Sequence, residues 1–425
     1  MKINRLKNPH FKKRLIFYFL VIVVALTMGV VSHYLLFGLN FVSNYRSHHD
    51  VLLLFLPVIG VLTAFVYENY GKGSQKGNNL IIESTQNEID VPFRMGIFTF
   101  LFTLLTHLFG GSAGREGSAV QIGGVLSNKA SQLFRLEKNQ HKQLIHAGVS
   151  AGFSSIFGTP LAGAFFGMEM VYIGKIERSS LISCFLASYI ANYTSLKFGT
   201  SHELHRIVDL PQMSWKLLFI VFIASILFGI FGRLFALWTH TLKRIYKEKI
   251  ANYLLRALIS ASIFVILILL FSGQQYEGLS LNLINHAFRG NSSWLDPILK
   301  LFYTGLTLGA GFQGGEVTPL FDIGASLGSV IGNLTNISPS FLAALGLISV
   351  FGCAANVPIT TIMLGIDLFG VEALPYYAMA SFISYLVSGH QGIYPAQTIV
   401  QAKSFYLKHH EGYRISDLTS RKENK

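Results

Sequence analysis

Hydrophobic residues gather in long runs separated by short polar segments, and this pattern predicts membrane-spanning helices. The first clear run, Leu15 to Leu39, contains no Asp, Glu, Lys or Arg. It is longer than the apolar core of a cleaved signal peptide, so we expect a retained span. Further apolar runs, a few with one embedded charge, lie at about 51–67, 95–114, 117–134, 144–168, 180–196, 214–240, 251–272, 301–315, 317–333, 339–356, 357–370 and 373–389.

Several of these runs are shorter than the ~20 apolar residues that a full span needs, and glycine or proline interrupts them. The stretch from Ile323 to Ile366 has no formal charge over 44 positions, yet Gly and Pro occur throughout it. Ion transporters use such short, interrupted helices to bring helix ends to the middle of the membrane. We therefore expect an all-α integral membrane protein built from many short and broken helices.

The sequence also carries a sparse internal duplication. A shift of 200 residues superposes Gly111 on Gly311, Gly114 on Gly314, Glu116 on Glu316 and Gly124 on Gly324. A shift of 198 residues superposes Gly148 on Gly346, Phe153 on Phe351, Pro160 on Pro358, Gly167 on Gly365 and Glu169 on Asp367. Secondary transporters are built from two such halves and hold the ligand between them. We expect one membrane domain over residues 1–402, with repeats at about 50–200 and 250–397, and a short tail over 403–425.

Composition and charge agree with a membrane protein. Charged residues make up 13% of the chain and hydrophobic residues 51%, whereas soluble proteins carry ~25% charged residues. The net charge of +13 comes largely from basic clusters before the first run, in a predicted loop after 214–240 and in the tail: Lys2, Arg5, Lys7, Lys12, Lys13 and Arg14; Lys243, Arg244, Lys247 and Lys249; Lys403, Lys408, Arg414, Arg421, Lys422 and Lys425. Basic residues at span ends place the N- and C-termini in the cytoplasm. We favour this over a nucleic-acid patch, and expect a multi-pass protein of the cell membrane without a nucleic-acid partner.

The two cysteines give no reason to expect a metal or a disulfide. Cys184 and Cys353 both lie in apolar surroundings, where a small core residue is the commoner role. We predict no metal site and no cofactor.

The stretch Gly110 to Gly124, GGSAGREGSAVQIGG, is the strongest candidate for chemistry. It contains six glycines and a single acid, Glu116, and the segment 95–114 has no charged residue at all. An ionised carboxylate between apolar segments is costly and usually faces a polar cavity or pathway. Dense glycine lets backbone N–H groups approach a ligand, and such groups at a helix N-terminus favour anions. We expect an anion site with a carboxylate inside the membrane.

Three motifs point to a family. GREGSAVQIGG at 114–124, TPLAGAFFGMEM at 159–170 and GGEVTP at 314–319 together resemble the CLC chloride channel and transporter family. The resemblance runs from about Gly71 to Gln397, and its details are most similar to the fluoride/proton antiporter branch. It implies an inverted repeat of short, tilted helices, and a homodimer in which each subunit holds its own pathway.

In that family the glutamate of GREG is a gate, which occupies the outer anion site and swings away when it is protonated or displaced. The resemblance therefore implies that Glu116 is the gating and proton-carrying residue. A carboxylate can compete with an anion for the same N–H donors, and it is neutralised when it gains a proton. The alternative is a structural ion pair between Arg115 and Glu116, which we disfavour because adjacent residues on a helix do not face one another.

Two further anion ligands follow from the resemblance. The family's first signature reads GSGIP, with a serine against the central anion; the aligned stretch here is GNNLI at 77–81, which puts Asn78 at the serine position. The amide of Asn78 can donate to an anion, Asn79 is the alternative donor, and by themselves these residues read as a turn. Tyr394, in HQGIYPAQ, matches the family tyrosine whose hydroxyl coordinates the anion.

The second-half signature departs from that of chloride members, which is close to GIFAP, and reads GEVTP here. The resemblance to the fluoride branch implies that Val317 and Thr318 line the anion site and that Glu316 modulates the anion or the proton. The alternative for Glu316 is an ordinary helix-start acid, stabilised by the helix dipole. Met170 stands where chloride/proton exchangers of the family carry a second, proton-handling glutamate, which leaves the intracellular proton route open.

These residues favour a fluoride/proton antiporter that exports fluoride as protons enter. One alternative is a chloride/proton antiporter or chloride channel of the same family. The other, from a different class, is an intramembrane enzyme that uses Glu116 with His107 as acid and base, although the chain lacks a convincing nucleophile or metal motif. We interpret His107 as a packing histidine and leave Asp322 unassigned.

Overall fold

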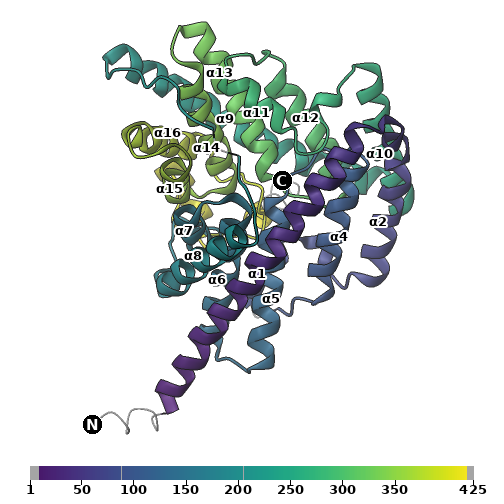
Figure 1. Cartoon of the computed structure of the whole chain (residues 1–425), viewed down its shortest axis with the longest axis vertical. Coiled ribbons are helices and arrows are strands. Elements are labelled where there is room, and N and C mark those ends of the chain that lie inside the picture. The colour runs from purple at the N-terminus through teal and green to yellow at the C-terminus, as the bar shows by residue number, and fades with distance from the viewer. Residues whose placement is uncertain (1–8, 88, 204, 419–425) are drawn as a thin grey trace.

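A computed structural model describes residues 9–87, 89–203 and 205–418. Its first half contains α1 (Pro9–Ser47), α2 (Leu56–Tyr70), α3 (Asn78–Asn87), α4 (Arg94–Leu108), α5 (Glu116–Leu133), α6 (Lys138–Phe157), α7 (Pro160–Glu169) and α8 (Leu181–Lys197). Its second half contains α9 (Trp215–Lys249), α10 (Tyr253–Leu270), α11 (Leu281–Phe288), α12 (Asp296–Gly309), α13 (Val317–Thr335), α14 (Pro339–Ala355), α15 (Pro358–Phe369) and α16 (Leu374–Val387). Figure 1 shows the resulting bundle.

The remaining regular elements are short. They are the 3₁₀ helices η1 (Asp50–Phe55), η2 (Ser74–Lys76), η3 (Arg178–Ser180), η4 (Gln274–Tyr276) and η5 (Phe405–His410), and the parallel strands β1 (Tyr172–Ile173) and β2 (Thr398–Ile399). The basic residues at positions 2, 5, 7, 421, 422 and 425 lie outside the described residues.

The expected all-α architecture is confirmed. Four helical segments are long and apolar enough to cross a membrane, at Lys12–Ser47, Asp50–Tyr70, Trp215–Lys249 and Tyr253–Leu270. Most other helices are shorter, as the glycine- and proline-rich runs predict. Three details differ from the sequence expectation: Lys243 to Lys249 form the last turns of α9 instead of a loop, and neither α3 nor the short α11 was predicted by an apolar run. Lysine and arginine are good helix formers, so they continue α9 past its apolar part.

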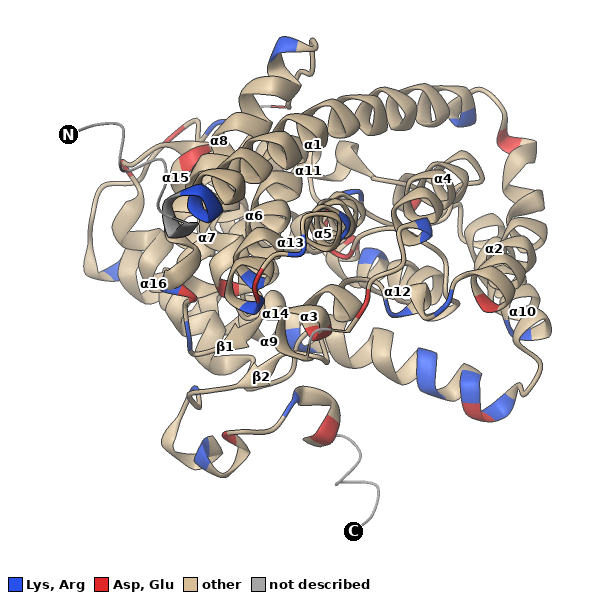
Figure 2. Cartoon of the chain, turned by 90° about the horizontal axis from the view of Figure 1, so that it is seen from below, with Lys and Arg blue, Asp and Glu red and all other residues tan. Residues whose placement is uncertain are grey.

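Apolar side chains cover the outside of the bundle. Six large ones on α1, α9 and α10 or directly after them are at least 65% exposed: Phe37, Phe41, Trp215, Phe219, Leu270 and Phe271. In Figure 2 the charged residues lie mainly at helix ends and in loops, and the long body of α1 carries charges at its two ends only. Such a surface is unstable in water and suits the hydrocarbon core of a bilayer.

The internal duplication has a structural basis in two close helix crossings. A Cβ added to Gly123 of α5 would lie 2.1 Å from the carbonyl oxygen of Gly148 of α6. A Cβ added to Gly324 of α13 would lie 2.1 Å from the carbonyl oxygen of Gly346 of α14. Small residues let membrane helices approach this closely. Because the same contact recurs in both halves, the two helix pairs are equivalent.

The register of this duplication corrects one sequence expectation. α5 begins at Glu116 and α13 at Val317, and an antiparallel bridge joins Gly114 to Gly315, so the helix starts are related by 201 residues. Glu316 is therefore the counterpart of Arg115, and the superposition of Glu116 on Glu316 was wrong by one residue. Both segments contain adjacent glycines, which allowed an ungapped comparison to slip.

The described part of the tail folds back on the membrane domain. The N–H of Ile399 donates to the carbonyl of Tyr413, and the N–H of Ile415 donates to the carbonyl of Gln397. The N–H of Ser416 donates to the carbonyl of Pro395. Residues 413–416 are thus hydrogen-bonded to the segment that follows Tyr394.

Candidate functional site

Glu116 lies where the two halves of the molecule meet. It is the first residue of α5 and is fully buried. Its Oε2 accepts hydrogen bonds from the backbone N–H of Thr318, at 3.1 Å, and from the Thr318 hydroxyl. The carboxylate of one repeat therefore occupies the N-terminus of α13 in the other, where unpaired N–H groups and the helix dipole favour an anion.

Arg115 also contacts this carboxylate, contrary to the sequence expectation. Its Nε donates to Oε1 of Glu116 at 3.3 Å, and its backbone N–H donates to Oε2 at 3.2 Å. Arg115 precedes the helix, so the rule that adjacent helical residues point apart does not apply to it. Arg115 and Glu116 therefore do form an ion pair. Glu116 also accepts hydrogen bonds from Thr318 in the other half, so Arg115 is not its only partner.

Two glycines allow the halves to approach so closely. Gly114 and Gly315 exchange two backbone hydrogen bonds of 2.6 Å each. A Cβ on Gly315 would lie 2.6 Å from the backbone nitrogen of Gly117, closer than real Cβ atoms come to backbone. The glycine-rich loops are thus required for the contact that brings Glu116 to α13.

Asn78 and Glu316 converge on the same place from other elements. Asn78 begins α3 and is buried, whereas Glu316 precedes α13 and is half-buried. A Cβ on Gly117 would lie 3.1 Å from Nδ2 of Asn78 and 3.4 Å from Oε2 of Glu316, so both side chains lie against this glycine. Oδ1 of Asn78 and Oε2 of Glu316 are buried without a hydrogen-bond partner. Val317 is also buried at the start of α13.

Tyr394 reaches this cluster from the end of the chain. It is 1% exposed, its hydroxyl has no hydrogen-bond partner, and the carboxylates of Glu116 and Glu316 both interact with it electrostatically. Its loop is held by Asn79, whose Oδ1 accepts from the N–H of Ala396 at 3.0 Å. The side-chain oxygen of Asn79 thus has a structural partner, and Asn78 is the residue of the pair that lies beside Glu316.

Sequence reasoning did not single out Lys243. This residue interacts electrostatically with Glu316 across a cavity of about 260 Å³, whose charged and polar lining includes Glu68, Lys76, Asn78, His240, Lys243, Arg256 and Glu316. We call it the Lys243 cavity. Because we assigned Lys243 to a basic loop, only the continuation of α9 to Lys249 reveals that it faces the cluster.

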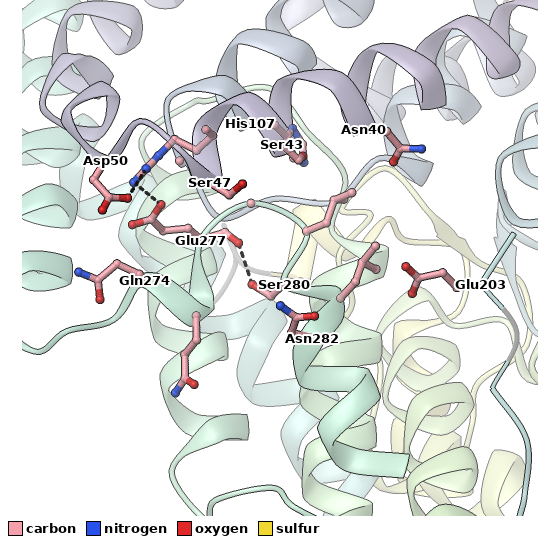
Figure 3. Close-up of a pocket in the computed structure, with 16 residues that line it drawn as sticks. Asn40, Ser43, Ser47, Asp50, His107, Glu203, Gln274, Glu277, Ser280 and Asn282 are labelled. Atoms are coloured by element: carbon pink, nitrogen blue, oxygen red, sulfur yellow. Dashed lines mark hydrogen bonds and ion pairs between the residues drawn. The ribbon is translucent and has the colours of Figure 1, made fainter. Parts of the chain in front are cut away.

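A second cavity of about 500 Å³ lies at the C-terminal end of α1. Figure 3 shows Asp50 and Glu277 pointing toward one another there; both bind Arg46, at 3.1 and 2.6 Å, and we call this space the Arg46 cavity. Burial raises the pKa of Glu277 to about 7, although the Arg46 guanidinium opposes this shift. Glu116 lines neither cavity.

His107 lines the Arg46 cavity but is fixed by the backbone. Its Nδ1 lies 2.7 Å from the carbonyl oxygen of Thr103 and its Nε2 lies 3.1 Å from that of Ala113. These bonds agree with a packing histidine. Within the described ranges, no group of His, Cys, Asp and Glu residues could hold a metal ion.

Comparisons with known proteins agree with this geometry. A model of the voltage-gated chloride channel family matches residues 59–389. A chloride/fluoride channel protein from Pseudomonas syringae pv. tomato is 38% identical over 407 residues, covering 93% of this chain and 89% of that protein. A proton/chloride exchange transporter from Vibrio campbellii is 26% identical over 386 residues, covering 82% and 81%. The crystal structure of a CLC-type fluoride/proton antiporter superposes with a TM-score of 0.87 at 37% identity, covering 90% of this chain and 97% of that one.

Proposed function

The chain belongs to the voltage-gated chloride channel (CLC) family, and we propose that it is a fluoride/proton antiporter that exports fluoride in exchange for protons. The observation that carries this proposal is that the N–H and the hydroxyl of Thr318 both donate to the Glu116 carboxylate. An anion can replace a carboxylate that accepts from the same hydrogen-bond donors. A proton on the carboxylate removes its charge and so weakens its hydrogen bonds to those donors. One residue then couples the two ions.

The anion site consists of groups around the start of α13. Its ligands are the amide of Asn78, the backbone of Val317, the hydroxyl of Thr318 and the hydroxyl of Tyr394, with Glu316 modulating the anion or the proton. The unpartnered hydroxyl of Tyr394 supports this assignment, because buried polar groups normally have partners and this one can donate to an anion. The donor end of the Asn78 amide, Nδ2, lies against Gly117 beside Glu116. Glu116 is the gate and the proton carrier.

Fluoride is favoured over chloride by the composition of this site. Fluoride is small and strongly hydrated, so its site must offer several close donors in place of water. An acid beside the site, Glu316, is unfavourable for a plain chloride pathway and suits a carrier that also handles protons. The chain is also similar to one protein described as a chloride/fluoride channel and to another described as a fluoride/proton antiporter.

We place both termini in the cytoplasm of a cell whose plasma membrane the protein spans. Basic residues lie at the start of α1, at positions 12–14, and at the end of α9, which lines the Lys243 cavity, and we assign both helix ends to the cytoplasmic side. The Lys243 cavity is then cytoplasmic and the Arg46 cavity extracellular. The protein works as a homodimer in the lipid bilayer, without a cofactor, and it is not an enzyme.

Ion movement in proteoliposomes tests this function. We expect an imposed fluoride gradient to drive protons against their own gradient, and an equal chloride gradient to drive far fewer. Proton movement driven equally well by chloride would make the protein a chloride/proton exchanger, and anion flux without any proton movement would make it a channel. The dimer is tested separately by light scattering of the detergent-solubilised protein.

A further inference from the structure

Lys300 and Asp322 form a buried ion pair that the proposed function does not use. Lys300 is on α12, Asp322 is on α13, both are fully buried, and Nζ lies 3.4 Å from Oδ2. A buried pair is weak evidence for stability, because removing two charges from water costs about as much as their attraction returns. Ionisable groups inside a membrane more often belong to an ion or proton route.

The ammonium group of Lys300 lies directly behind the wall of the Arg46 cavity. Its Nζ donates to the hydroxyl of Ser280 at 2.9 Å and to the carbonyl oxygen of Gly278 at 3.3 Å. Both residues line that cavity. On its other side Nζ donates to the hydroxyl of Ser112 at 3.0 Å, in the loop that leads to Glu116. The amine is therefore placed between the extracellular cavity and the gate.

The carboxylate of Asp322 is unusually poor in partners. The ammonium of Lys300, 3.4 Å from Oδ2, is the one partner of this carboxylate among the described residues, and no other group donates to either oxygen. Burying a carboxylate with a single partner is costly. Asp322 lies one helical turn beyond Thr318, which binds Glu116, and the two carboxylates interact electrostatically.

We propose that Lys300 and Asp322 relay protons between the Arg46 cavity and Glu116. In the first step an N–H bond of Lys300 breaks and an O–H bond forms on Asp322. The neutral amine then takes a proton from water in the cavity by way of the Ser280 hydroxyl. In the last step the O–H bond of Asp322 breaks as the carboxylate of Glu116 gains the proton, and the ion pair is restored.

Other charged groups surround the relay without replacing it. Lys300 and Glu116 are the charged groups that act on Asp322 itself. His107 on α4 interacts with both Lys300 and Arg115, and Arg115 binds Glu116. Both nitrogens of His107 are engaged by backbone carbonyls, so this histidine has no free atom to pass a proton onward.

The experiment compares Asp322→Asn in two backgrounds, the unaltered protein and Glu116→Ala. The inference rests on the proposed function: because Glu116 is the proton carrier there, Glu116→Ala should carry fluoride without protons. In the unaltered background we expect Asp322→Asn to slow fluoride-driven proton uptake by about 100-fold, the contribution typical of a positioned proton-transfer group. In the Glu116→Ala background, fluoride flux should stay unchanged. The relay is overturned if Asp322→Asn leaves proton uptake unchanged in the unaltered background. It is also overturned if Asp322→Asn lowers fluoride flux in the Glu116→Ala background as much as it lowers proton uptake in the unaltered one.

Controls separate the relay from folding and from the proposed function. Asp322→Glu should recover proton uptake, because it keeps a carboxylate. Asp296→Asn alters another buried acid, one whose oxygens accept from the Tyr276 hydroxyl and the Ser293 N–H, and should not slow uptake. If Asp322→Asn does not fold, Lys300→Met with Asp322→Asn removes both charges and is judged by the same outcomes. Absence of fluoride-driven proton uptake in the unaltered protein overturns the proposed function, and the relay with it.

Discussion

Glu169 lies at the end of α7 and caps the start of α15, and Asp367 lies near the end of α15 and caps the start of α7. Glu169 is the last residue of α7, and its carboxylate accepts from the N–H groups of Ile359 and Thr360 at the start of α15, at 3.1 and 2.8 Å. Asp367 lies near the end of α15, and its Oδ2 accepts from the N–H of Ala162 at the start of α7, at 2.8 Å. The shift of 198 residues superposes the two acids, and they occupy equivalent places in the two repeats.

Removing one of these caps should destabilise the protein. We expect Glu169→Ala to lower the free energy of unfolding by about 1–2 kcal/mol, because it leaves the first N–H groups of α15 unpaired in a buried place. The measurement is thermal unfolding of the detergent-solubilised protein. Glu248→Ala, at an exposed carboxylate near the end of α9, is the matched control and should leave the midpoint unchanged. Equal midpoints for the two variants would show that the caps do not stabilise the fold.

Thr318→Val should weaken fluoride binding. The variant keeps the backbone N–H but removes the hydroxyl that donates to Glu116 and, in our proposal, to the anion. A hydrogen bond to a charged group contributes about 1.5 kcal/mol, so half-saturation should need roughly tenfold more fluoride. Fluoride-driven proton uptake over a concentration series measures this shift.

Two variants of the same helix control that experiment. Thr318→Ser should restore affinity, and Thr335→Val, whose hydroxyl donates to the carbonyl of Ile331 at the far end of α13, should behave like the unaltered protein. If Thr318→Val and Thr335→Val have the same half-saturation, the Thr318 hydroxyl does not bind fluoride.

Lys243→Met should slow entry of fluoride from the cytoplasmic side. Its positive charge faces the Lys243 cavity beside Glu316, and such a charge raises the local anion concentration about tenfold or more. The loss should shrink at high ionic strength, because salt screens the charge. Fluoride efflux at low and high salt measures both effects. Lys247→Met, on the same helix but away from the cavity lining, should have little effect. If Lys243→Met and Lys247→Met slow fluoride efflux equally, the effect comes from the overall charge of α9 and not from the position of Lys243.

A histidine pair makes docking of the tail sensitive to pH. Nε2 of His390 accepts from the N–H of Lys403 at 3.1 Å, so a neutral His390 carries its proton on Nδ1, which lies 2.9 Å from Nδ1 of His410. Burial, together with the charges of Lys403, His410 and His409, lowers the pKa of His390 from 6.5 to about 4. Burial also lowers the pKa of Lys403, to about 7.

The sign of this dependence follows from the lowered pKa values. The docked tail favours neutral His390, so this contribution to docking is complete above pH 6.5 and is lost as the pH falls toward 4. Lys403 is charged in both states below pH 7 and adds nothing in that window. Mobility of a spin label at Lys408→Cys should therefore rise between pH 6.5 and 4. His390→Gln should remove this rise and His48→Gln, at an exposed histidine, should not; identical curves for all three proteins would exclude the histidine pair.

The sequence predicted the helices better than their ends. Apolar runs with Gly and Pro located nearly every helix, because burial in lipid or in the core requires apolar side chains there. The end of α9 was missed, because charged residues that belong to a helix end and to a loop look alike in sequence. The repeat was recognised, but its register slipped by one residue at the adjacent glycines before α5 and α13, and this changed the counterpart of Glu316 from Glu116 to Arg115.

What the sequence determined by itself is a duplicated membrane protein with one carboxylate, Glu116, isolated among glycines. Hydrophobic periodicity and the cost of a buried charge are local properties, so they can be read from the order of residues. Only the tertiary structure decided that Thr318 binds this carboxylate, that Tyr394 reaches it from the end of the chain, and that Lys300 and Asp322 pair behind it. These contacts join residues far apart in sequence, and their geometry depends on how closely glycine-lined helices pack.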